Sequence, residues 1–96
     1  MEILVVYDVS TATPAGRTRL RRVAKICEAY GQRVQKSVFE CLLAPEQLVL
    51  LQHDLKQEIN IQTDSIRIYR LREPHNRYTF MMGRQPQFDL RDPLVL

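Results

Sequence analysis

The chain has 96 residues, of which 45% are hydrophobic, and a formal net charge of +3. This length predicts one domain with a modest core, which burial against a second copy would enlarge. No apolar run approaches the roughly 18 residues of a membrane span, and residues 1–9 lack the basic start and small-residue cleavage site of a signal peptide, so we expect a soluble cytoplasmic protein without a membrane partner.

The N-terminal third predicts a strand, a loop and a helix. Residues 3–7 form a continuous apolar, β-branched run, which is typical of a central strand buried on both faces. The following loop ends at Thr13, a candidate N-cap, with Pro14 in the first helical turn. Gly31 would end the helix as a left-handed C-terminal cap. The apolar residues at helical spacing are Leu20, Val23, Ala24, Cys27 and Tyr30.

Positive charge is concentrated in this helix and the turn after it. Between Thr11 and Lys36 there are seven basic residues and one acid, whereas the other segments together carry seven basic and ten acidic residues. Several of the arginines occupy the first helical turns, where the helix dipole disfavours cations. The favoured interpretation is a surface that binds nucleic-acid phosphates, and the alternative is a basic face that only aids solubility. The seven residues are Arg17, Arg19, Arg21, Arg22, Lys25, Arg33 and Lys36.

Residues 34–43 predict a β-hairpin. Val34, Val38 and Phe39 have strand-forming side chains, and Lys36-Ser37 mark the turn or bulge between two short strands. We expect Phe39 in the core and Ser37 in the turn, where its hydroxyl could also bind a phosphate.

The second half predicts another helix and one or two more strands. Pro45 opens a helix, and Ile66–Leu71 alternates apolar and charged residues, like a strand with one wet face. Tyr78–Met82 is a short candidate for a fifth strand. The apolar stripe of the second helix is Leu48, Leu51, Leu55 and Ile59.

The resulting order, βαββαβ with an extra C-terminal strand, predicts a ferredoxin-like α+β sandwich. In this class two helices cover one face of an antiparallel sheet. We assign residues 1–82 to this domain. Residues 83–96 form a tail that is either flexible or docked on a partner subunit.

The two cysteines carry no metal-binding or redox signature. Cys27 and Cys41 form no C-x-x-C pair, and a zinc site with His53 and His75 would match no known spacing. We interpret them as reduced core residues.

Asp8 is the acidic residue best placed for a chemical role. It lies at the C-terminal end of the first predicted strand, and a carboxylate there can bind a hard cation such as Mg²⁺. The alternative is a turn-forming or helix-capping aspartate. The adjacent Tyr7 could stack on a base or lie buried in the strand.

Four segments together resemble one family. They are the apolar first strand ending in Tyr7-Asp8, G-R-T-R-L at Gly16–Leu20, Y-G-Q-R-V-Q-K-S-V-F-E-C at Tyr30–Cys41, and the leucine-patterned second helix. In this order they resemble the Cas-two family of small CRISPR-associated proteins, partners of the Cas-one integrase. The resemblance implies that Tyr7-Asp8 matches the family position proposed to bind metal. It also implies that Ser37 and Phe39 belong to a functional or metal-adjacent motif.

The resemblance implies two functions, and the same residues would serve either of them. The first is an endonuclease that depends on Mg²⁺, or on Mn²⁺, and cleaves RNA or duplex DNA, with Asp8 shared across a homodimer. The second is a non-catalytic dimeric adaptor that holds duplex DNA while the Cas-one integrase performs strand transfer in spacer acquisition. A third interpretation, an RNA-binding ferredoxin-like module, lacks the expected R-G-F-x-F-type stretch of exposed aromatics.

Overall fold

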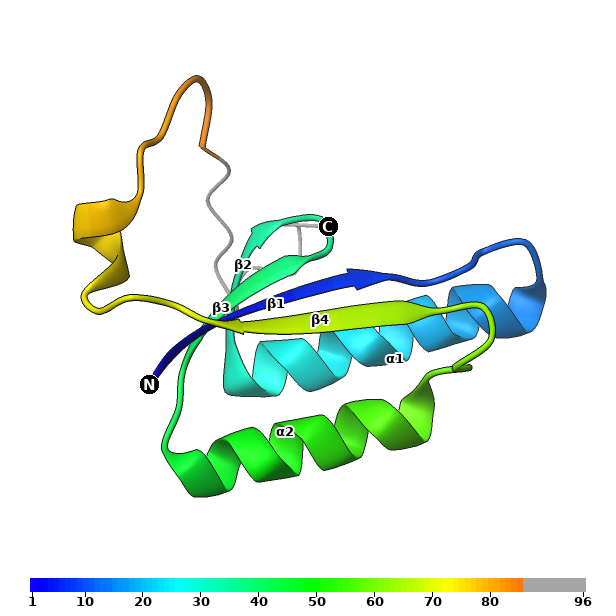
Figure 1. Ribbon diagram of the computed structural model, residues 1–96. Coiled ribbons are helices and arrows are strands. Elements are labelled where there is room, and N and C mark those ends of the chain that lie inside the picture. Colours follow the sequence, from blue (N-terminus) through cyan, green and yellow to red (C-terminus); the bar gives the residue numbers. More distant parts are fainter. Residues whose placement is uncertain (86–96) are drawn as a thin grey trace.

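The computed structural model describes residues 1–85, which form a sheet with two helices packed on one of its faces (Figure 1). This arrangement confirms the ferredoxin-like α+β class. The elements are β1 (Glu2–Asp8), α1 (Pro14–Tyr30), β2 (Gly31–Gln35), β3 (Val38–Leu42), α2 (Pro45–Glu58), β4 (Ser65–Arg70) and a 3-10 turn, η1 (His75–Tyr78).

All strand pairs in the sheet are antiparallel, in the order β2-β3-β1-β4. The central strand β1 places Val5 beside Phe39 of β3 on one side and beside Ile68 of β4 on the other. The strands β2 and β4 form the two edges. The end of β1 therefore lies next to both the β2–β3 hairpin and the start of β4.

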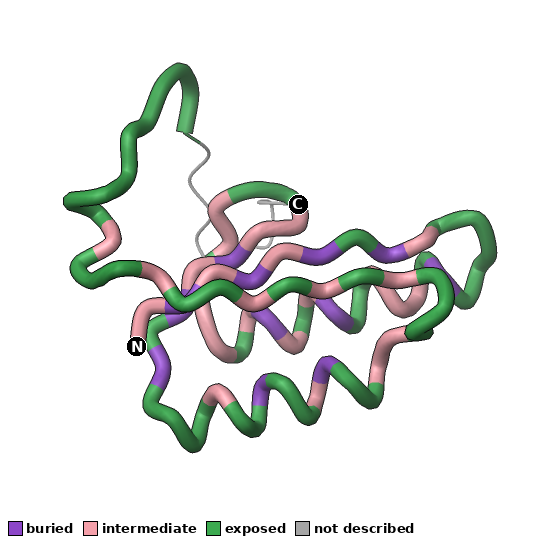
Figure 2. The backbone as a smooth tube through the Cα atoms, in the orientation of Figure 1, coloured by how far each residue is buried: buried purple, intermediate pink, exposed green. Residues whose placement is uncertain are grey.

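The strand β1 is buried on one face rather than on both. Ile3, Val5 and Tyr7 are buried against the helices, whereas Leu4 and Val6 are half-buried (Figure 2). The prediction of burial on both faces is therefore wrong for the part of the chain that the structure describes. The continuous apolar run suggested burial on both faces. In the structure both helices pack on the same side of the sheet, and no second layer of residues 1–85 covers the other side. We call that other side the open face.

The first helix starts as the sequence predicts. The hydroxyl of Thr13 accepts a hydrogen bond from the Gly16 amide at 3.1 Å, and Pro14 begins the helix. Val23 and Cys27 of α1 are fully buried, as are Phe39 of β3 and Leu51 of α2. Neither helix of residues 1–85 is both long and apolar enough to cross a membrane.

The cysteines are core residues, as predicted. Both are buried and reduced, and burial raises the pKa of Cys27 to about 12 and that of Cys41 to about 11. The thiols are therefore protonated at neutral pH, which makes them poor nucleophiles and poor metal ligands.

Gly31 ends α1 for a different reason from the one predicted. Its φ of −164° is extended, not left-handed, and it is already the first residue of β2. A Cβ at this position would overlap the carbonyl oxygen of Glu40 and the sulfur of Cys41. Glycine is thus needed for the close approach of β2 to β3, rather than for a helix cap.

The predicted fifth strand over Tyr78–Met82 does not form in this chain. Tyr78 closes the turn η1, and Thr79–Gln85 are exposed and outside any strand. A strand needs a neighbour to pair its backbone, and after Arg70 the chain leaves the sheet (Figure 1). Most of the predicted tail, residues 86–96, lies outside the described residues.

Candidate nucleic-acid interface

The basic residues of α1 divide between two sides of the helix. Arg17, Arg21 and Lys25, spaced four residues apart, face the β2–β3 hairpin. Arg19 and Arg22 instead reach residues in or just after α2. The sequence predicts one basic surface because all five residues share a helix, but spacing along the helix assigns them to two neighbours.

A groove of about 520 Å³ lies between α1 and the hairpin turn. Five cationic side chains line it, together with one carboxylate and the hydroxyl of Ser37. It thus brings together residues from the helix and the turn that the sequence had proposed for phosphate binding. Its charged residues are Arg17, Arg21, Lys25, Arg33, Lys36 and Glu28.

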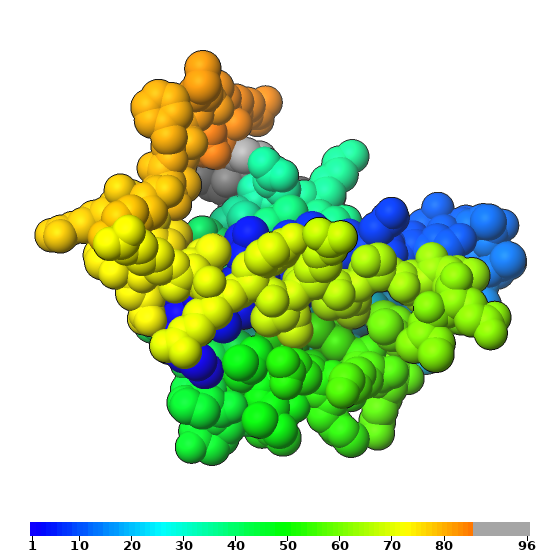
Figure 3. All heavy atoms as spheres, viewed as in Figure 1, coloured from blue at the N-terminus to red at the C-terminus, as the bar shows by residue number. Residues whose placement is uncertain are grey.

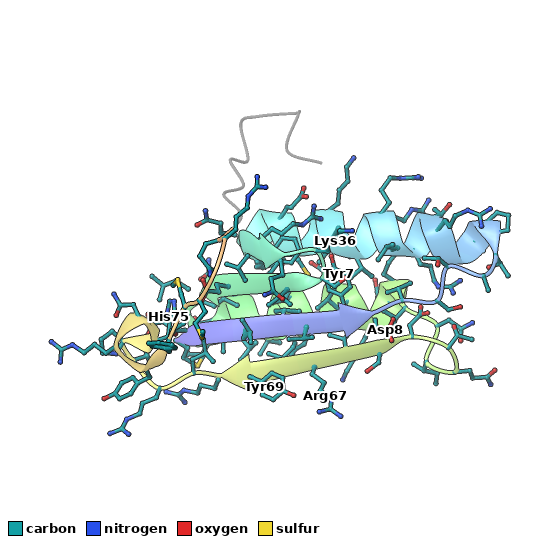
Figure 4. All side chains as sticks on the ribbon, turned by 90° about the horizontal axis from the view of Figure 1, so that it is seen from above. Tyr7, Asp8, Lys36, Arg67, Tyr69 and His75 are labelled. Atoms are coloured by element: carbon teal, nitrogen blue, oxygen red, sulfur yellow. The ribbon has the colours of Figure 1, made fainter. Side chains whose placement is uncertain are left out.

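Tyr7 fixes the hairpin turn against the end of β1 (Figure 4). Its hydroxyl donates a hydrogen bond to the Lys36 carbonyl at 3.3 Å, and its amide donates one to the Ser37 carbonyl at 3.1 Å. Burial raises the pKa of Tyr7, although nearby Arg33 opposes the shift, so the hydroxyl remains a donor. Tyr7 is therefore a buried strand residue that positions the groove rim, not an exposed platform for a base.

Phe39 and Arg33 contact each other beside the groove. Phe39 is fully buried, as predicted, and its ring lies 6.2 Å from that of Tyr7. The Arg33 guanidinium lies 5.1 Å from the centre of the Phe39 ring, and its Nη2 is 3.5 Å from Oε1 of Glu28. These contacts hold Arg33 at the groove with its side chain only 15% exposed.

Arg19 belongs to a buried network around Asp64. Its Nε donates to Oδ2 of Asp64 at 2.8 Å, and the Asp64 side chain is fully buried. The Ser10 and Asn60 amides and the Thr63 hydroxyl also donate to this carboxylate. Burial alone would raise the pKa of Asp64, but the hydrogen bonds outweigh it and lower the pKa to about 2. We therefore leave Arg19 out of the phosphate-binding surface.

Arg22 is less firmly held. Its Nη1 lies 3.6 Å from Oε1 of Glu58, and its side chain is 64% exposed. Such exposed pairs contribute little to stability. Arg22 nevertheless points toward α2 rather than into the groove.

Asp8 lies at the same end of β1 as the groove, but its side chain faces the other way. Successive strand side chains alternate between faces, so Tyr7 points to the helices and exposed Asp8 points to the open face, opposite Ser65 of β4 (Figure 4). In residues 1–85 no group of three or more His, Cys, Asp or Glu side chains could hold a metal ion. Asp8 therefore belongs to no such group among residues 1–85, and it is not one of the residues that line the groove.

A ferredoxin-like sandwich with a cationic groove defines a class of small α+β proteins suited to polyanionic ligands. The family model described as CRISPR associated protein Cas2 matches residues 1–78. A relative named CRISPR-associated endoribonuclease Cas2 1, from Moorella thermoacetica, is 53% identical over 96 residues, which covers 100% of both chains. The chain therefore belongs to the Cas2 family, the Cas-two family that its motifs resemble.

Two further comparisons agree with this assignment. A CRISPR-associated endonuclease Cas2 from Halalkalibacterium halodurans is 46% identical over 95 residues, or 99% of each chain. The crystal structure of Streptococcus pyogenes Cas2 at pH 6.5 shares 54% sequence identity and a TM-score of 0.79, covering 86% of this chain and 100% of that one. The fold and the family are thus established together.

The Asp64 network predicts a pH-dependent contribution to stability. The carboxyl has an ordinary pKa of 3.8 and a folded pKa of about 2, so its contribution is complete above about pH 4 and is lost as the pH falls toward 2. Asp64→Asn should lower the free energy of unfolding by about 1–3 kcal/mol at pH 7. Denaturant unfolding from pH 7 to pH 2 should show the difference from wild type shrinking.

A matched control is Asp54→Asn. Asp54 accepts a hydrogen bond from the Tyr30 hydroxyl at 3.0 Å, which an amide oxygen can still accept, so this variant should lose less. A difference between wild type and Asp64→Asn that stays constant down to pH 2 would contradict the assignment.

Proposed function

We propose that the protein is a metal-dependent endonuclease of CRISPR systems, which hydrolyses phosphodiester bonds in RNA or duplex DNA and acts in spacer acquisition. The observation that carries the proposal is the groove, which is lined by five cations from α1 and the β2–β3 hairpin. Cations spaced along a groove suit a phosphate backbone. Contacts of this kind read no bases, so binding should largely ignore sequence.

The names of the relatives support nuclease activity. The Moorella relative is named an endoribonuclease and the Halalkalibacterium relative an endonuclease. Sequence identities of 53% and 46% over nearly the whole chain make a shared activity the simplest proposal. The endoribonuclease name favours RNA as the first substrate to test.

Asp8 is the residue we assign to catalysis and to Mg²⁺, with Mn²⁺ as a substitute. Asp8 is exposed and belongs to no group of three or more possible ligands among residues 1–85, whereas such a cation prefers six oxygens. Two Asp8 carboxylates across a homodimer, completed by water and phosphate oxygens, would be sufficient. Bound there, Mg²⁺ would neutralise charge on the phosphodiester under attack. The place of Asp8 on the open face supports this arrangement, because no second layer of residues 1–85 covers that face.

The homodimer has further support in exposed apolar surface. On the open face Leu42 is 76% exposed, and Tyr69 is 43% exposed and lies beside half-buried Leu4. Beyond the sheet, Phe80 and Met82 are 88% and 77% exposed. Surface of this kind is typical of a protein interaction site. We propose that the open faces of two copies pack together and that the C-terminal segments dock on the partner.

The alternative is a dimeric adaptor without catalytic activity, which holds duplex DNA and bridges subunits of the Cas-one integrase. The observation that favours it is that Asp8 does not line the groove and belongs to no group of three or more His, Cys, Asp or Glu side chains among residues 1–85 that could hold a metal ion. Both functions use the same groove. They differ in whether Asp8 is needed for cleavage.

The first test concerns the groove and uses two adjacent arginines. Arg21 lines the groove, whereas Arg22 points toward Glu58. Arg17→Gln combined with Arg21→Gln should weaken binding to RNA and duplex DNA and lower the slope of log affinity against log salt by about two. Arg22→Gln should leave the slope nearly unchanged. Equal effects of Arg21→Gln and Arg22→Gln in fluorescence anisotropy titrations would exclude the groove as the contact surface.

The second test separates the endonuclease from the adaptor. Asp8→Asn keeps the shape of the side chain and removes the charge, so cleavage should fall about 100-fold or more, while nucleic-acid affinity and stability stay close to wild type. Wild type and variant should pass through identical purification, and Mg²⁺, Mn²⁺ and EDTA should be compared on RNA and on duplex DNA. Cleavage that survives Asp8→Asn, or that disappears on further purification of wild type, would favour the adaptor.

The third test concerns the dimer. Leu42→Asp places a charge on the open face, whereas Val49→Asp places one on the outer side of α2, where Val49 is 63% exposed. Light scattering should give twice the 11.3 kDa of one chain for wild type and for Val49→Asp. Leu42→Asp should shift the mass toward one chain. A monomeric wild type at micromolar concentration would overturn the proposed dimer and the shared Asp8 site with it.

A further inference from the structure

Arg67 is a basic residue that the sheet places on the same face as Asp8. In the ladder between β1 and β4, Asp8 pairs with Ser65 and Val6 pairs with Arg67. Strand residues two apart point to the same face, so Arg67 is the diagonal neighbour of Asp8. Diagonal neighbours in a sheet lie roughly 7–8 Å apart, which is within reach of a long side chain.

Arg67 also differs in charge from the other charged residues of the open face. Among the residues of β1, β3 and β4 that point to this face, the charged ones besides Arg67 are the acids Glu2, Asp8 and Glu40. Glu2 and Glu40 both contact His75. The cations of the groove lie between α1 and the hairpin turn. Within these three strands, Arg67 is therefore the cation that a phosphate beside Asp8 would meet.

The phenol of Tyr69 holds the Arg67 side chain. Nη1 of Arg67 donates a hydrogen bond to the Tyr69 hydroxyl at 3.1 Å, and both residues lie on β4 (Figure 4). Tyr69 pairs with Leu4 and is thus farther along the sheet from Asp8 than Arg67 is. Arg67 forms no ion pair with an acid of residues 1–85. A neutral hydroxyl fixes the guanidinium but leaves its positive charge uncompensated.

Both side chains are accessible from outside the molecule. Strand β4 is an edge of the sheet, Arg67 is exposed, and Tyr69 is partly exposed. Figure 3 shows β4, in yellow-green, uncovered along the front of the molecule. The edge position puts Arg67 at the margin of the open face, so a nucleic-acid strand could reach it while a second copy covers the middle of that face.

We propose that Arg67, held by Tyr69, binds a phosphate next to the scissile one and so positions the nucleic-acid strand at Asp8. This inference rests on the proposed function. A guanidinium binds phosphate oxygens through two parallel N–H···O bonds, and with Nη1 engaged by Tyr69 the donors on Nε and Nη2 remain for that purpose. Because the guanidinium is directed toward Tyr69, it contacts a phosphate outside the metal position. Arg67 therefore contributes to binding rather than to the chemical step.

The binding test compares Arg67→Gln with Arg70→Gln. Arg70 is an exposed arginine of the same strand, but it pairs with Ile3 and points to the helix side. Both substitutions are made in Asp8→Asn with EDTA, which removes the carboxylate that would repel phosphate without a metal ion and prevents metal-dependent cleavage. In fluorescence anisotropy titrations, Arg67→Gln should lower the slope of log affinity against log salt by about one. Arg70→Gln should leave it nearly unchanged.

The cleavage test uses steady-state kinetics with Mg²⁺ on chains that retain Asp8. Arg67→Gln should raise KM about 10-fold with kcat within about twofold of wild type, because it removes a contact that the ground state and the transition state share. Arg67→Lys should raise KM less, since the charge stays while the two-bond geometry is lost. Tyr69→Phe should also raise KM, but should add nothing in Arg67→Gln, because Tyr69 acts through Arg67. Light scattering should give each variant the mass of wild type.

Two outcomes would overturn the inference. An unchanged salt slope in Arg67→Gln would leave Arg67 only as a charge that protects an edge strand from pairing, and a fall in kcat at unchanged KM would place it in the chemical step instead. A purified wild type that cleaves neither RNA nor DNA would overturn the proposed function. The salt slope would still decide whether Arg67 contacts a phosphate, so the two failures are distinguishable.

Discussion

Both helices pack on the same face of the sheet, and the alternation of side chains along β1 therefore sorts its residues into two environments. Ile3, Val5 and Tyr7 enter the core, whereas Leu4, Val6 and Asp8 point to the open face. A shift of one residue in the register of β1 would exchange the two sets. The antiparallel pairs with β3 and β4 and the apolar core below them fix that register.

This alternation places the two proposed parts of the nuclease on different faces. Tyr7, on the helix side, holds the Lys36-Ser37 turn and with it the rim of the groove. Asp8, one residue later, cannot point into the same groove. A nucleic-acid backbone that is bound in the groove must therefore pass the end of β1 to reach Asp8 of the same chain, or it must reach the Asp8 of a second copy. The dimer is for this reason part of the proposed mechanism and not an addition to it.

The sequence predicted those features of the fold and the site that depend on local signals. The Thr13-Pro14 start of α1 and the hairpin turn at Lys36-Ser37 follow from residues close together in the chain. The failures involve distant partners. Nothing near Arg19 indicates that Asp64, 45 residues away, would bind it, and the close approach of Cys41 to Gly31 depends on strand pairing.

The two ends of β1 hold different groups. Glu2 at the start of the strand accepts a hydrogen bond from the His75 backbone amide, whereas Tyr7 and Asp8 at its end lie at the groove rim and at the proposed metal position. The strand is seven residues long, which at about 3.3 Å per residue puts Glu2 roughly 20 Å from Asp8. The groups at the start of β1 are therefore too far from Asp8 to contact a phosphodiester that is bound there.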